Sequence, residues 1–136
     1  MNVIPFPSWR VFCFLDDEGT NAIVRGMNQA GVTPTDRSCL QLQIYLLEAG
    51  GPGTLPGLIV PVVKDFFAFS VKPRKGSTPM NPVFCYGPFG ESEITLLTWA
   101  PIEGGLLKAR DVLPKAERNL AVLKDNRKRR IRERIG

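Results

Sequence analysis

The first part of the chain changes from a strand pattern to a helix pattern. Residues 9–15 (WRVFCFL) are aromatic and β-branched, which is typical of a strand. A short helix is predicted next, and Gly31 is placed to end it, because glycine readily adopts the left-handed conformation that follows many helices. A second helix is predicted from Pro34 to about Ala49. Its buried stripe is predicted from apolar residues at helical spacing: Leu40, Ile44 and Leu47.

The middle of the chain has the composition of strands. Residues 58–63 are predicted to be extended, and residues 66–72 (FFAFSVK) form a clearer strand. Two further strands, 83–86 (VFCY) and 94–99 (ITLLTW), are joined by turn-forming residues at 87–90 (GPFG). Together with the first strand, these segments predict a small, mostly antiparallel sheet.

A last helix follows, with an apolar face that is expected to pack on the sheet. That face consists of Leu113, Ala116, Leu120 and Leu123. Beyond Asn126 the face becomes basic, so residues 124–136 are expected to form a basic C-terminal helical extension. The chain is therefore expected to be a single α+β domain over residues 1–136, with two N-terminal helices, a small antiparallel sheet and a basic C-terminal helix.

The net charge of +5 is distributed unevenly along the chain. Residues 1–107 carry seven Lys and Arg against nine acids, whereas residues 108–136 carry eleven against four. Such a basic segment favours contacts with the phosphates of a nucleic acid, although a solvated face that aids solubility is the alternative. The candidate nucleic-acid-binding residues at this end are Arg127, Lys128, Arg129, Arg130 and Arg132.

A second basic group lies in a Gly/Pro-rich loop after the strand at 66–72. It consists of Lys72, Arg74 and Lys75, which either bind an anion or are simply exposed. The three cysteines, Cys13, Cys39 and Cys85, are widely spaced, and the chain has no histidine. We therefore expect reduced thiols with no metal site and no cofactor. No apolar run is long enough to cross a bilayer and no secretory signal is visible, so no membrane association and a cytoplasmic location are expected.

The order of these elements resembles the RelE/HigB toxin superfamily, in particular its phage-derived branch. The resemblance covers about residues 9–125 and is carried by several short segments. They are the strand WRVFCFL with its DDEG turn, the Leu-rich helix ending in Gly-Gly-Pro-Gly, the series FFAFSVK, VFCYG and EITLLTW, and the stretch from Lys108 to Arg118. The resemblance implies a βααβββα order, with a three-stranded meander and a basic last helix.

The same resemblance implies a toxin-like RNA-binding protein, a candidate metal-independent endoribonuclease acting on ribosome-bound mRNA and neutralised by a cognate antitoxin. Such cleavage needs a proton acceptor, a proton donor and cations around the transition state. On the family template, Tyr86 could donate a proton, and the basic residues entering the last helix could stabilise charge. Those basic residues are Lys108, Arg110 and Arg118.

Departures from the family pattern keep a second function open. Ser70 stands where many relatives carry an arginine in the first meander strand, and no histidine is present to act as a base near neutral pH. The alternative is a non-catalytic descendant that binds nucleic acid or an acidic protein partner, as an accessory or structural protein of a phage or mobile element. Tyr86 would then be a half-buried core aromatic residue.

Overall fold

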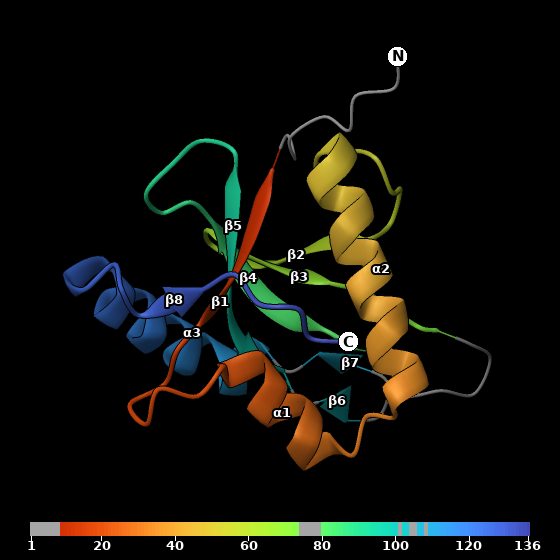
Figure 1. The fold of residues 1–136 in the computed structure, drawn as a ribbon. Helices are drawn as coiled ribbons and strands as arrows, with labels where there is room; N and C mark the ends of the chain where they lie inside the picture. The colour runs from red at the N-terminus through yellow and green to blue at the C-terminus, as the bar shows by residue number, and fades with distance from the viewer. Residues whose placement is uncertain (1–8, 74–79, 101, 104–105, 108) are drawn as a thin grey trace.

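The computed structural model describes residues 9–73, 80–100, 102–103, 106–107 and 109–136. For residues 102–103, 106–107 and 109–111, it describes the backbone and not the side chains. Within the described residues, three helices and a six-stranded sheet form the body of the protein (Figure 1). A separate two-stranded hairpin consists of β6 (Ile102–Glu103) and β7 (Leu106–Leu107). The helices are α1 (Ala22–Ala30), α2 (Pro34–Gly50) and α3 (Ala109–Asp125), and the strands of the large sheet are β1 (Arg10–Phe14), β2 (Ile59–Val63), β3 (Phe66–Phe69), β4 (Pro82–Tyr86), β5 (Glu93–Trp99) and β8 (Arg130–Ile131).

The strands of the large sheet lie in the order β2-β3-β4-β5-β1-β8. Neighbouring strands are antiparallel except β1 and β5, which are parallel. The chain between these two strands passes through α1, α2 and the strands β2 to β4. In β2, the pairing register with β3 shifts between Pro61 and Val63. The α+β class, the mostly antiparallel sheet, the two N-terminal helices and a C-terminal helix packed on the sheet are all confirmed.

Two layers of helices cover the two faces of this sheet (Figure 1). On one face, α1 and α2 bury Ile23, Met27 and Leu40 against Phe69 and Phe84. On the other face, α3 buries apolar residues against alternate positions of the same strands. These residues are Val112, Ala116 and Leu123 of α3 with Val83, Cys85 and Leu97 of the sheet. The alternation follows from the two-residue period of a strand, which turns neighbouring side chains to opposite faces.

The helices begin and end where local chemistry favours it. The Asn21 side chain accepts hydrogen bonds from the backbone N–H groups of Ile23 and Val24, so it caps α1, and Gly31 ends that helix in the left-handed conformation. Thr33 caps α2 by accepting a hydrogen bond from the backbone N–H of Asp36. None of the helices in the described ranges is long and apolar enough to span a membrane.

The predicted helical extension over residues 124–136 is wrong. Helix α3 ends at Asp125, and the C-terminal arm, residues 126–136, forms a turn, the short strand β8 and a coil that reaches α2 (Figure 1). Strand β8 pairs with β1, and Leu15 N–H donates to the Arg129 carbonyl at 2.8 Å. The physical reason is that β1 would otherwise be an edge strand with unpaired backbone N–H and C=O groups. Pairing of the arm with these groups is favoured over continuation of the helix.

We predict that Gly26→Ala destabilises the protein by about 1–3 kcal/mol, because a Cβ at this position of α1 would overlap the Trp99 side chain where it leaves the backbone of β5. The free energy of unfolding in urea measures the effect. Gly53→Ala is the matched control, because a Cβ there meets nothing within 4 Å, and its effect should stay within about 0.5 kcal/mol. Equal effects of the two substitutions would contradict the close packing of α1 on β5.

Candidate nucleic-acid interface

The two predicted catalytic residues whose side chains the structure describes, Tyr86 and Arg118, do not come together. Tyr86 ends β4 on the face covered by α1 and α2, where its ring contacts Phe67 and Phe84 with centroids 5.1 and 5.5 Å apart. Arg118 lies on the exposed side of α3, on the other face of the sheet. Lys108 lies outside the described residues, and Arg110 is described only as part of the backbone of α3.

The surroundings of Tyr86 are those of a packed aromatic residue. Its side chain is 39% exposed, and a third ring, that of Trp9, lies with its centroid 6.1 Å away. Burial raises the pKa of the Tyr86 phenol above its ordinary value of 10.0, so the phenol stays protonated at neutral pH and is a weaker acid than usual. These contacts explain the position of Tyr86 without a catalytic role.

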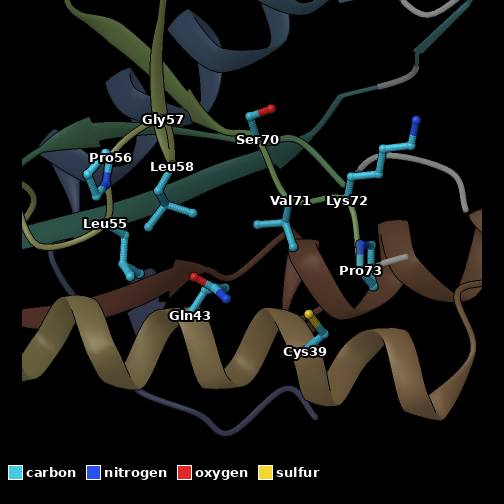
Figure 2. A pocket seen from close by; sticks show the side chains of 10 residues that line it. All are labelled: Cys39, Gln43, Leu55, Pro56, Gly57, Leu58, Ser70, Val71, Lys72 and Pro73. Carbon is cyan, nitrogen blue, oxygen red and sulfur yellow. The ribbon is translucent and has the colours of Figure 1, made fainter. Parts of the chain in front are cut away.

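The basic loop is represented in the structure by Lys72 alone, since Arg74 and Lys75 lie outside the described residues. Lys72 is exposed and borders a cleft of about 360 Å³ between α2 and the segments flanking β2 and β3. Cys39 and Gln43 of α2 form one wall of this cleft, and the Lys72 side chain extends away from that wall (Figure 2). The cleft therefore brings Lys72 to no second described cation.

Three arginines of the C-terminal arm are bound by the protein's own carboxylates. The Arg129 guanidinium lies 2.9 Å from Asp17 and also donates to the Leu15 carbonyl at 3.0 Å. The other two pairs are Arg132 with Glu48, at 3.0 Å, and Arg130 with Glu93. These arginines therefore hold the arm to the body, which leaves them less available to phosphates than their sequence run suggested.

The pair of Arg130 and Glu93 is buried, with each side chain only 8% exposed. To reach Glu93 on β5, the Arg130 side chain crosses β1 above Phe12, with its guanidinium carbon 3.7 Å from the ring centroid. The same guanidinium lies 4.8 Å from the Phe89 ring centroid. A buried guanidinium needs such a partner, because an unpaired charge in the interior is very costly.

Glu48 joins three parts of the fold. Its carboxylate on α2 accepts a hydrogen bond from the backbone N–H of Val11 in β1 at 3.0 Å, as well as pairing with Arg132. Farther along the arm, Ile135 N–H donates to the Gln41 side chain of α2 at 2.7 Å. Glu48 and Glu93 were not predicted as structurally important residues. The available signal was an acid directly beside an apolar run (IYLLE and EITLL), which needs a cation or hydrogen-bond donors once it is buried.

A group of cations remains after these pairs are removed. We call it the α3 basic surface, and it consists of Lys115, Arg118 and Lys124 of α3 with Arg127 and Lys128 of the following turn. All five side chains are exposed, and no carboxylate in the described part of the chain forms an ion pair with any of them. The nearby Glu117 pairs with Lys64 at 3.4 Å. This surface is therefore the strongest anion-binding feature among the described residues.

Among the residues that the structure describes, no group of three or more acidic or cysteine side chains could hold a metal ion. Comparison with known proteins found no match to a family model, to a curated protein or to a solved structure.

We predict that Arg130→Ala and Glu93→Ala each destabilise the protein by about 3–5 kcal/mol, because either leaves an unpaired charge in a buried site. The double replacement Arg130→Met with Glu93→Met should cost less than either single change, since it removes both charges and keeps apolar volume. Urea unfolding measures all three. Asp17→Ala, which breaks the exposed pair with Arg129, is the control and should cost about 0–1 kcal/mol. Single changes as mild as this control would contradict a buried anchoring pair.

We also predict that one thiol per native chain reacts with Ellman's reagent at mildly alkaline pH. Burial raises the pKa of Cys13 to about 12 and that of Cys85 to about 11, so both remain protonated and inaccessible. Cys39 is half-buried and lies at the cleft beside α2. Cys39→Ser should abolish the native reaction, while unfolding in urea should expose all the remaining thiols. Rapid reaction of native Cys39→Ser would show that Cys13 or Cys85 is accessible.

Proposed function

We propose that this protein is a non-catalytic RNA-binding protein, related by descent to the RelE/HigB-like toxins, which binds RNA through the α3 basic surface. The observation that carries the proposal is the set of five exposed cations without a carboxylate partner in the described ranges. The order β1, α1, α2, then β2 to β5 and α3 supports the relationship, since it contains the βααβββα order that the resemblance implies. The additions to that order are one strand of the series β2 to β5, the hairpin of β6 and β7, and β8 after α3.

The way the arm is held strengthens the electrostatic argument. Acids of the body, including Asp17, Glu48 and Glu93, are occupied by the arginines of the C-terminal arm. Five of the cations without a carboxylate partner in the described ranges lie on α3 and its turn. From Lys115 to Lys124 the helix rises about 14 Å, at about 1.5 Å per residue. Exposed cations spread around this helix and its turn can contact phosphates of a nucleic acid, whose bound counterions are then released.

The separation of Tyr86 from Arg118 is the observation that favours the non-catalytic alternative over the endoribonuclease. A proton donor and a charge-stabilising arginine must act on the same phosphate, and these two side chains lie on opposite faces of the sheet. Cleavage of ribosome-bound mRNA, neutralisation by a cognate antitoxin and binding of an acidic protein partner all stay predictions.

We expect the double variant Arg118→Ala with Lys124→Ala to weaken RNA binding and its dependence on salt. Each phosphate contact contributes about 0.7 to the slope of log affinity against log salt for a single strand, so the slope should fall by about 1.4. Fluorescence anisotropy of a labelled single-stranded oligoribonucleotide over a range of salt concentrations measures this slope.

The charge-matched control is Arg25→Ala with Arg37→Ala. Arg25 and Arg37 belong to α1 and α2, on the other side of the sheet, so the same loss of net charge should leave the slope unchanged. Absence of RNA binding by the unaltered protein, or equal slopes for the unaltered protein and the α3 variant, would overturn the proposal. Equal competition by polyglutamate would overturn RNA as the ligand and favour an acidic protein.

A further inference from the structure

Two arginines contact the same aromatic ring, but only one of them has a carboxylate partner. The guanidinium carbons of Arg130 and Arg127 lie 4.8 and 4.9 Å from the Phe89 ring centroid. Arg130 is buried and paired with Glu93. Arg127 is exposed, and the described chain offers it no carboxylate. Arg130 therefore anchors the arm to the body, and of the two only Arg127 remains available to a ligand.

The Phe89 ring and the turn that carries Arg127 are each fixed by further contacts. Phe89 lies in the turn between β4 and β5 and packs, partly buried, against the core beneath α3. The turn that carries Arg127 is fixed by two hydrogen bonds, from Lys128 N–H to the Asn126 side chain at 3.1 Å and from Arg129 N–H to the Asn126 carbonyl at 3.0 Å. The turn and the Phe89 ring thus position this flat, charged group at the surface.

We infer that Arg127, whose guanidinium carbon lies over the Phe89 ring, binds an unpaired base of single-stranded RNA. This inference rests on the proposed function and adds to it a preference for single strands. A guanidinium plane with one side against a ring can stack a base on its other side, while its N–H groups reach a phosphate at its edge. Lys124 and Lys128 flank Arg127 in sequence and supply further charge for the backbone of the same strand. In a duplex the base faces are already stacked on one another, so this subsite selects single strands.

The test compares three RNA ligands of equal length: a single strand, the same strand with its bases removed, and a duplex. Stacking of one base changes affinity by about tenfold, so the unaltered protein should bind the single strand about tenfold more tightly than its abasic counterpart. Arg127→Lys keeps the charge and removes the flat guanidinium. It should reduce the tenfold preference for the base-containing strand to about twofold or less.

Phe89→Leu removes the ring that orients Arg127 and should abolish the same preference. Because Phe89 contributes to the core, the exposed Arg127→Lys is the decisive variant. Its control is Arg10→Lys, at an exposed position of β1 outside the α3 basic surface, which should keep the preference. Equal binding of the base-containing and abasic strands by the unaltered protein, or an unchanged preference in Arg127→Lys, would overturn the stacking site while leaving RNA binding intact. Failure of the unaltered protein to bind any of the three ligands would overturn the proposed function and this inference together.

Discussion

The ion pair between Arg130 and Glu93 ties together elements that the chain order keeps apart. Glu93 starts β5, Arg130 lies on β8, and β1 runs between them in the sheet. Two residues of backbone pairing are too little to hold an edge strand by themselves, since such a strand makes few ladder hydrogen bonds. The buried side-chain pair supplies the missing attachment, and the Arg132–Glu48 pair repeats it at α2.

This arrangement changes the meaning of the charge asymmetry in the sequence. An acidic body and a basic C-terminal segment suggest a surface for an external polyanion, but the two parts are largely complementary to each other. Asp17, Glu48 and Glu93 come from the β1 turn, α2 and β5, and each meets one arginine of the arm. Much of the positive charge that remains for a partner lies on α3 and its turn, which is a smaller surface than the composition suggested.

Local patterns were sufficient to predict most of the elements. Aromatic and β-branched runs predicted β1, β3, β4 and β5, and the apolar spacing at Leu40, Ile44 and Leu47 predicted the buried side of α2. The parallel pairing of β1 with β5 and the hairpin of β6 and β7 were not predicted, because strand pairing depends on contacts between distant residues. The C-terminal arm was mistaken for helix for the same reason. Likewise, the basic residues could be identified from the sequence, but the carboxylate partners of Arg129, Arg130 and Arg132 could not.

The proline in β2 has a consequence for how copies of this protein behave toward one another. Strand β2 forms the edge of the sheet opposite β8, and an exposed edge invites pairing with the edge of another molecule. Pro61 lacks a backbone N–H and stands where the register shifts, so the outer side of β2 offers an interrupted row of donors and acceptors. One edge ends in the two-residue strand β8 and the other is interrupted by a proline, so both are poor templates for edge-to-edge pairing between molecules.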